Sequence, residues 1–501
     1  MKKAIYLVEL LALGALTLGA CGSSSKKGGS SGETSGSGQS SGQSGQSSQG
    51  SSSSKPIAEI TYRSWDYGTE GQDNEERQLI RLFEQKENVK VNIVENPGTG
   101  NGYWDGIKAS IVNGIDLADV MMVPNLDWPL AANYLLNIKQ YADADQEFGK
   151  VPSSIRDACT FKSGIYAVPA RMNLQGYFMN STLVEGTLGI RTSNINVNSG
   201  YDVIENIVNE AAKKQDVVGL DTAAHFIDTM ASVLDDTGTM GYFTWDGSEY
   251  HLDSEAFITG VQKARAMYES KKTLDAYNEE EKTALGLDLE IEAKVDAWNK
   301  GKLALRYGYT YEIPDMLDKN TLNQKIKFIG NPGGKISIVG DYYGIYKETK
   351  HPEIAYKFAK WMSFGLDGFK KRMELYEPKG SVNSLPLTDD QDLIDEYFDK
   401  FGSSSELTGL EAAYRYIQTK SMVEGVKVVP GFLQARQNKK TGLNVQVGDA
   451  VLENIKMFDL LNNCIIGGLE IANYTSGAIN IDTIADKTYS DWMSLYGDQY
   501  E

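Results

Sequence analysis

The segment from residue 22 to residue 55 most constrains what this chain can fold into. It consists almost entirely of Ser, Gly and Gln, with four charged residues. Because these side chains cannot build a hydrophobic core, we expect a flexible tether with a reach of roughly 30 Å. A folded body is therefore expected only in residues 56–501, which are numerous enough for two domains.

The residues before this segment indicate export. Two lysines precede an apolar run, Ala4–Ala20, which is short for a membrane span and contains Glu9. Small residues and Cys21 close the run, and Leu18–Cys21 resembles the lipobox of a bacterial lipoprotein signal. The resemblance implies a signal peptide over residues 1–20 and acylation, with palmitate, at Cys21. The chain would then be lipid-anchored at the extracellular face of the cytoplasmic membrane; an ordinary signal peptide or a spanning helix is the alternative.

Charge and cysteine content exclude several classes of partner. The body holds 44 Lys and Arg against 66 Asp and Glu, a net charge of −22. Such an acidic surface argues against nucleic acid and anionic lipid, and it is compatible with a neutral solute. Cys159 and Cys464 are too few for a disulfide framework, so we expect buried thiols. The three histidines lie far apart in sequence, so we expect neither a metal site nor a cofactor.

The body opens with a pattern typical of an α/β fold. Ile57–Arg63 alternates apolar and polar residues as a strand does, Asp73–Gln85 has helical spacing, and Val89–Val94 is a second strand. A β-α-β opening predicts parallel pairing and a helix-covered sheet. Asp119–Val123 is a further buried strand. Ligands collect at the carboxyl ends of such strands, which is where Trp65 and Trp128 fall.

The rest of the body reads as alternating helices and strands. The predicted helices are Tyr103–Val112, Pro129–Leu136, Tyr201–Lys214, Ile227–Asp235, Glu255–Lys271, Glu279–Asn299 and His351–Phe364. The predicted strands are Gly164–Pro169, Gln175–Met179, Leu303–Tyr307, Ile326–Ile329 and Tyr342–Tyr346.

Six motifs in chain order resemble one family, the extracellular solute-binding proteins of ABC transporters, of the sugar-binding type related to maltose-binding protein. The motifs are a strand ending in Trp at Ile60–Trp65, then Val112–Val120, Tyr134–Tyr141, Lys162–Asn180, Trp298–Leu305 and Pro332–Met362. Ala118 and Leu305 replace the family's usual Pro and Met.

The resemblance implies a two-lobed α/β fold of type II, with a ligand cleft between the lobes and hinge crossovers. Residues 56–165 and 326–368 would form lobe 1, and residues 166–325 and 369–501 would form lobe 2. Closure around the ligand is the state that such a permease recognises. We therefore expect a monomer that is not an enzyme, captures a carbohydrate, expected to be an oligosaccharide, and delivers it to an ABC importer.

Aromatic faces cover the apolar faces of sugars, and planar polar groups bind their hydroxyls. The candidate ligand-binding residues share these chemistries and lie in loops and at strand ends. They are Trp65, Asp66, Tyr67, Asp127, Trp128, Tyr177, Asn180, Tyr307, Tyr309, Asp341, Tyr342, Phe432 and Arg436. Each aromatic residue could instead be packing, Asp66 and Asp127 could cap the helices that follow them, and Arg171 and Arg436 could be ion-pair partners.

Three other functions stay open at this point. A tethered glycoside hydrolase needs two carboxylates about 5–10 Å apart, and an acidic chain offers many. A receptor for a peptide or a polyamine would suit an acidic cleft. A sensor or adhesion lipoprotein would need no transporter.

Overall fold

We describe the fold from a computed structural model of the chain. It describes residues 56–66, 72–94, 101–115, 117–123, 126–376, 384–402, 406–417, 421–423, 445–447, 450–452, 457–466, 470–471, 490–491 and 493–494. Among these residues, none of the helices has both the length and the apolar content needed to cross a membrane.

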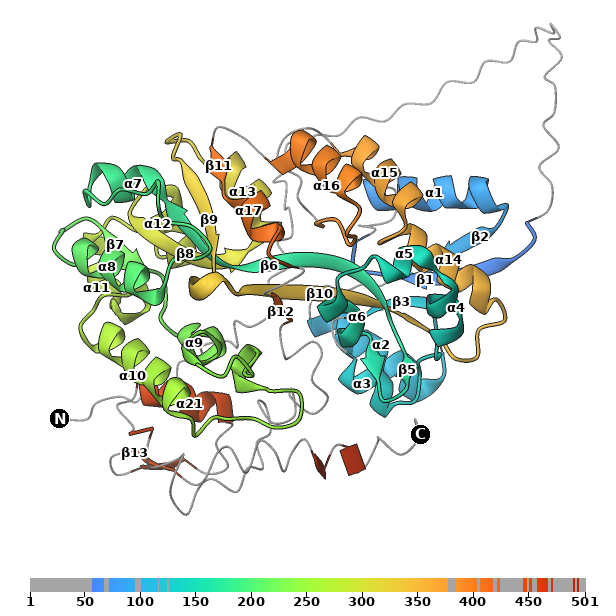
Figure 1. The fold of residues 1–501 in the computed structure, drawn as a ribbon, viewed down its shortest axis with the longest axis horizontal. Coiled ribbons are helices and arrows are strands. Elements are labelled where there is room, and N and C mark those ends of the chain that lie inside the picture. The colour runs from blue at the N-terminus through green and yellow to red at the C-terminus, as the bar shows by residue number, and fades with distance from the viewer. Residues whose placement is uncertain are drawn as a thin grey trace, which may run out of the picture.

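Three parallel strands form the sheet of one lobe, on the right in Figure 1. Strand β1 (Glu59–Arg63) lies between β2 (Lys90–Ile93) and β3 (Val120–Val123). Helix α1 (Glu75–Glu87) connects β1 to β2, so the predicted parallel β-α-β unit is confirmed. The Asn74 side chain caps α1, whose buried face includes Leu79, Ile80 and Phe83.

Two long strands run across the middle of the molecule and join this lobe to the other (Figure 1). Strands β6 (Val168–Asn180) and β10 (Ile336–Ile345) pair antiparallel from Val168↔Tyr343 to Ser337↔Gln175. β10 then pairs with β3, whereas β6 continues between β8 (Leu303–Tyr309) and β9 (Ile326–Gly330). The predicted break between the strands Gly164–Pro169 and Gln175–Met179 is wrong, because β6 runs unbroken from Val168 to Asn180 and only Gly164–Ile165 forms a separate short strand before it.

The second lobe surrounds β8 and β9. β7 (Val218–Leu220), which sequence analysis missed, pairs parallel with β8, and β11 (Leu407–Thr408) pairs parallel with β9. Its helices are α7 (Ser181–Gly186), α8 (Tyr201–Ala211), α9 (Phe226–Leu234), α10 (Glu255–Glu269), α11 (Glu279–Ala284), α12 (Ala293–Asn299) and α13 (Ile313–Asp318). The prediction of a single helix over 279–299 is wrong, because this segment forms two helices, α11 and α12. The first helix ends just before Gly286, whose backbone φ of +79° is unfavourable for residues other than glycine.

Shorter elements complete the described chain. The remaining helices are α2 (Asn101–Asn113), α3 (Asp127–Ala131), α4 (Lys139–Ala144), α5 (Gln146–Gly149), α6 (Ser153–Ala158), α14 (Pro352–Trp361), α15 (Leu366–Leu375), α16 (Gln391–Tyr397), α17 (Leu410–Tyr414) and α21 (Met457–Ile466). The remaining strands are β4 (Thr160–Phe161), β5 (Gly164–Ile165), β12 (Ser421–Val423), β13 (Val445–Val447) and β14 (Ala450–Leu452). Single-turn helices are η1 (Tyr242–Thr244), η2 (Leu274–Ala276), η3 (Thr310–Glu312), η4 (Pro332–Gly334) and η5 (Phe398–Gly402).

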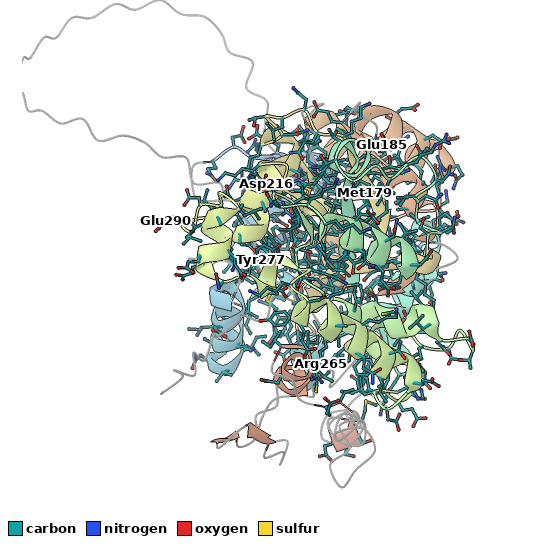
Figure 2. The ribbon with its side chains drawn as sticks, turned by 90° about the vertical axis from the view of Figure 1, so that its left-hand side faces the viewer. Met179, Glu185, Asp216, Arg265, Tyr277 and Glu290 are labelled. Carbon is teal, nitrogen blue, oxygen red and sulfur yellow. The ribbon has the colours of Figure 1, made fainter. Side chains whose placement is uncertain are left out.

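The chain beyond residue 368 returns to both lobes. In α15, Arg372 bonds Glu76 of α1, whereas β11 pairs with β9. Helix α21 packs on α10, and Figure 2 shows Arg265 of α10 beside it. The lobe boundaries at 165/166, 325/326 and 368/369 stay predictions, but α15 lies against the first lobe. Cys159 and Cys464 are free, buried thiols in separate apolar clusters.

Candidate functional site

The crossing strand β6 has one apolar face and one polar face. Val168, Ala170, Met172 and Leu174 lie in the main hydrophobic core, and the alternate residues Arg171, Asn173 and Gln175 must point the other way. On β10, Ser337 lies opposite Gln175 and Asp341 opposite Arg171, so their side chains share that face. We call Arg171, Asn173, Gln175, Ser337 and Asp341 the polar crossover face.

The first lobe reaches one end of this face through Asp66. Directly after β1, the Oδ2 atom of Asp66 accepts a hydrogen bond from Nε of Arg171 at 2.8 Å. Asn74, not Asp66, caps α1 and also donates its side-chain amide to the Asp66 carbonyl. The helix-capping alternative for Asp66 is therefore excluded, and the ion-pair role of Arg171 is confirmed.

Buried charges behind Asp66 change its titration. Burial raises the pKa of Asp66 to about 6, although the Arg171 guanidinium lowers it. Glu76 lies deeper and accepts from both Arg171 and Arg372. Burial also raises the pKa of Glu76, but the two guanidinium groups outweigh this and hold it below its usual value.

Trp65 lies at the same strand end and is partly buried. Its ring meets the ring of Tyr103 edge-on, with centroids 5.0 Å apart and planes at 86°. Tyr103 is fixed in turn because its hydroxyl donates to the carbonyls of Arg63 and Met122. The indole is therefore held at a defined angle at the carboxyl end of β1.

The second lobe reaches the other end of the polar crossover face through Tyr309, the last residue of β8. Nε2 of Gln175 donates to the Tyr309 hydroxyl at 3.0 Å, and Oε1 of Gln175 accepts from Ser337 at 3.1 Å. The ring of Tyr309 stacks on Tyr311, with centroids 4.9 Å apart and planes at 10°. Both rings are partly exposed. Sequence analysis missed Gln175 and Tyr311; their positions on β6 and after β8 are the signal that could have found them.

Asp66 and Tyr309 thus contact one strand from the two lobes. Their partners Arg171 and Gln175 are four residues apart on the same face of β6, a spacing of about 13 Å along an extended strand. Asp341 is half-buried on the same face. These residues are the part of the predicted site that the described structure brings together.

Four other predicted site residues lie inside the protein. Tyr177, Tyr307 and Tyr342 belong to the apolar clusters and are buried, and Asn180 caps α7. Their burial favours the packing alternative for the three tyrosines, and a ligand role for any of the four stays a prediction.

His225 brings an unpredicted polar ring to the second lobe. It lies at the N-terminus of α9 and stacks on Tyr307 at 4.0 Å with planes at 17°. Asp221, at the end of β7, accepts from the backbone nitrogen of Tyr307 at 3.2 Å, and burial raises its pKa. A ligand role for His225 could have been suspected only after β7 was recognised, because its loop follows that strand.

The remaining predicted positions lie outside the described residues. These are Cys21, Tyr67, Phe432 and Arg436, together with the side chains of Asp127 and Trp128. Their roles stay predictions.

One group of side chains in the described part of the chain has metal-ligand chemistry: Asp246, Glu249 and His251. Nε2 of His251 lies 2.9 Å from Oδ2 of Asp246, and Oδ1 of Asp246 accepts from the backbone of Ser248 and Glu249. Although burial opposes it, hydrogen bonds from the backbone of Glu249 and from His251 hold the pKa of Asp246 below its usual value. The Asp246 carboxylate therefore already bonds the backbone and His251, and these hydrogen bonds are those of a tight turn.

Comparison with known proteins identifies the family. The family model described as bacterial extracellular solute-binding protein matches residues 67–363, more than half of the chain. The chain belongs to this family. None of the curated proteins matches it in sequence.

Solved structures share its fold at low sequence identity. An ABC substrate-binding protein from Listeria monocytogenes in complex with cycloalternan is 15% identical, with a TM-score of 0.58 over 88% of this chain and 99% of that one. The galacto-N-biose/lacto-N-biose I-binding protein of an ABC transporter from Bifidobacterium longum, in complex with lacto-N-biose, is 13% identical, with a TM-score of 0.58 over 89% and 98%. A sugar transporter from Rhizobium etli in an open conformation is 12% identical, with a TM-score of 0.59 over 87% and 99%. The predicted α/β fold of the two-lobed type II class is confirmed.

Proposed function

We propose that this protein captures a carbohydrate outside the cell and delivers it to an ABC importer. The family match carries the proposal, because this family binds extracellular solutes. The sugar class is supported by the fold neighbours, whose structures contain cycloalternan and lacto-N-biose.

The geometry of the polar crossover face supports an oligosaccharide as ligand. Stacked tyrosine rings at one end and an indole with a carboxylate at the other offer the two chemistries that sugars need. The spacing of about 13 Å between the two ends exceeds one pyranose ring and suits a chain of two or three. Asp66, Trp65, Tyr309 and Asp341 are the described residues that we assign to ligand contact.

A thermal-shift panel tests the sugar assignment. The probes are maltotetraose, cycloalternan and lacto-N-biose, with spermidine and a tripeptide as the alternatives. A ligand at 100 times its dissociation constant stabilises the folded state by about 2.7 kcal/mol, which raises the Tm measurably. A rise in Tm with a sugar that is recovered chemically unchanged supports a sugar receptor without catalysis. A shift with spermidine or the peptide alone contradicts the sugar class, and steady turnover of a sugar contradicts the absence of catalysis.

Tethering is the second part of the proposal and rests on the resemblance of Leu18–Cys21 to a lipobox. In Cys21→Ala, acylation is impossible, so we expect the variant in the supernatant after the membranes are pelleted, and the natural chain in the pellet. Metabolic labelling with a palmitate analogue should mark the natural chain and not the variant. A variant that stays membrane-bound through carbonate washing would contradict the lipid anchor.

A further inference from the structure

Asp66 is the outer end of a chain of alternating charges that crosses four structural elements. Oδ2 of Asp66 accepts from Nε of Arg171 on β6 at 2.8 Å, and Nη2 of Arg171 donates to Oε2 of Glu76 on α1 at 3.3 Å. The same Oε2 accepts from Nη1 of Arg372 on α15 at 3.0 Å. Oε1 of Glu76 accepts from the hydroxyl of Tyr62 on β1 at 3.0 Å.

Exposure falls along this chain of charges. The side chain of Asp66 is 21% exposed and that of Arg171 is 9% exposed, whereas those of Glu76 and Arg372 are only 1% and 3% exposed. A solute can therefore reach Asp66 and not Glu76. Arg372 also pairs with the partly exposed Glu75 at 3.3 Å, so in the described structure three acids surround two guanidinium groups and the buried Glu76 is compensated from two sides.

Glu76 fixes the orientation of Arg171. A guanidinium is planar and donates along fixed directions, so bonds from Nε to one carboxylate and from Nη2 to another determine its plane. Tyr62 and Arg372 hold Glu76 from two further sides. Asp66 lies beyond the end of β1, and the hydrogen bond from Arg171 holds its carboxylate in place.

We propose that Glu76 is a positioning residue for ligand binding: by fixing Arg171 it orients the Asp66 carboxylate toward the sugar hydroxyls. The inference rests on the proposed function for the presence of the sugar, but the effect of Glu76 on Asp66 is measurable without any ligand.

The groups that face Asp66 determine how it titrates. They are Arg171 on β6, Glu76 on α1, Asp341 on β10 and Arg372 on α15. Glu76 and Asp341 raise the pKa of Asp66, whereas Arg171 and Arg372 lower it, and burial brings it to about 6. Neutralising Glu76 therefore lowers the pKa of Asp66. The charge of Glu76 alone would produce this shift, so the affinity at pH 7.5, where Asp66 is ionised, separates the two roles: without a positioning role, Glu76→Gln would shift the midpoint and leave that affinity unchanged.

The experiment compares Glu76→Gln with Glu76→Asp, which keeps the charge, and with Glu353→Gln as a matched control. Glu353 pairs with Lys357 on the exposed side of α14 and is not among the groups that shift the pKa of Asp66. Carboxyl carbon NMR of labelled aspartate, with the Asp66 signal assigned by Asp66→Asn, gives its titration midpoint in the ligand-free mature chain. Calorimetry with maltotetraose, cycloalternan and lacto-N-biose from pH 5 to pH 8 gives affinity and proton release.

In the natural chain we expect Asp66 to titrate near pH 6, and sugar binding to weaken below that pH and to release protons at it. In Glu76→Gln the NMR midpoint and the acid limit of binding should both fall by about 0.5–1 pH unit, with affinity at pH 7.5 reduced about five- to tenfold. Glu76→Asp should restore the midpoint, and Glu353→Gln should leave both measurements unchanged. Asp66→Asn should abolish the proton release.

An unchanged Asp66 midpoint in Glu76→Gln, or unchanged affinity at pH 7.5, would overturn the proposal. If Glu76→Gln does not fold, Glu76→Gln/Arg372→Met removes one charge of each sign and leaves no surplus buried charge. Because Glu76 acts on Asp66 more strongly than Arg372 does, the midpoint should still fall. If no probe sugar binds the natural chain, the sugar assignment fails, and the NMR midpoints alone decide whether Glu76 controls Asp66.

Discussion

The side-chain amide of Gln175 donates to the phenolic oxygen of Tyr309 across 3.0 Å. Gln175 lies on the strand that joins the lobes, and Tyr309 ends the strand β8 of the second lobe. Ser337 on the other crossing strand donates to the same glutamine. The orientation of the Tyr309 ring is therefore tied to both crossing strands, β6 and β10, which lie where closure of the lobes around a ligand would act.

We expect Tyr309→Ala to weaken sugar binding by about 1–2 kcal/mol, because it removes a stacked ring and its hydroxyl. Tyr309→Phe keeps the ring and should weaken sugar binding by about 1 kcal/mol, since the buried amide of Gln175 loses the hydroxyl that accepts its hydrogen bond. Tyr141→Ala is the matched control: it removes a ring that stacks on Tyr356 at 5.6 Å, in the first lobe. Calorimetry with the sugar found in the thermal-shift panel measures each affinity. Equal losses in Tyr309→Ala and Tyr141→Ala would assign Tyr309 to stability alone.

The indole of Trp65 is predicted to cover a sugar ring from the first lobe. Trp65→Ala should weaken binding by about 1–2 kcal/mol, and Trp65→Phe should recover part of it because a smaller aromatic face remains. Trp245→Ala provides the control, since Trp245 packs on Tyr250 at 4.8 Å in the second lobe and lies outside the predicted site. Affinity by calorimetry is compared with Tm for each variant. A fall in Tm with full affinity in Trp65→Ala would leave its contact with Tyr103 as its whole role.

Much of the fold could be predicted because the local patterns are strong. The β-α-β opening follows from alternation in Ile57–Arg63 and helical spacing in Asp73–Gln85, and both elements form where expected within two residues. Strand β6 was divided in the prediction although Ala170–Gln175 alternates with a period of two. Its polar residues face partners on β10 and at Asp66, beyond the end of β1, that only the folded chain brings close.

The site was less predictable because strand register decides which residues face it. Tyr307 and Tyr309 are two residues apart on β8, yet Tyr307 is buried under His225 and Tyr309 is partly exposed beside Tyr311. Asp66 was recognisable from its place after β1. Its partner Arg171 lies 105 residues away, and no local pattern encodes that pairing.

The pH dependence of stability should reveal the ionisation of Asp66. Its pKa is raised from an ordinary value of 3.8 to about 6. The folded state then holds a proton that the unfolded state has lost between these values, so this residue favours folding less as pH rises from 4 to 6. Asp66→Asn avoids that cost and should be more stable than the natural chain by about 1–3 kcal/mol at pH 7.5, with the difference vanishing near pH 4.

The contribution of Glu76 to the pH dependence of stability has the opposite sign, because its lowered pKa gives stability that is lost as pH falls. Denaturant unfolding of the natural chain and of Asp66→Asn, at pH 4 and at pH 7.5, measures the difference in stability at each pH. A larger stabilisation by Asp66→Asn at pH 4 than at pH 7.5 would contradict the raised pKa.

Gly176 marks the point where β6 enters the second lobe, and its close packing there can be tested. A Cβ atom at this position would lie 2.6 Å from the carbonyl carbon of Gly330 on β9, and a backbone atom cannot swing away as a flexible side chain can. The pairing of β6 with β9 also shifts register at the next residue, between Tyr177 and Phe178. Gly176→Ala should therefore destabilise the protein by about 2–4 kcal/mol.

Gly186→Ala is the matched control for this variant. Gly186 ends α7 in the same lobe, and a Cβ atom there would meet nothing within 4 Å. The control should leave stability within about 0.5 kcal/mol of the natural chain. Because Gly176 adjoins Gln175, we also expect Gly176→Ala to weaken sugar binding by displacing the bond to Tyr309. Denaturant midpoints and calorimetric affinities check both effects, and a neutral Gly176→Ala would show that β9 can move away from β6 without cost.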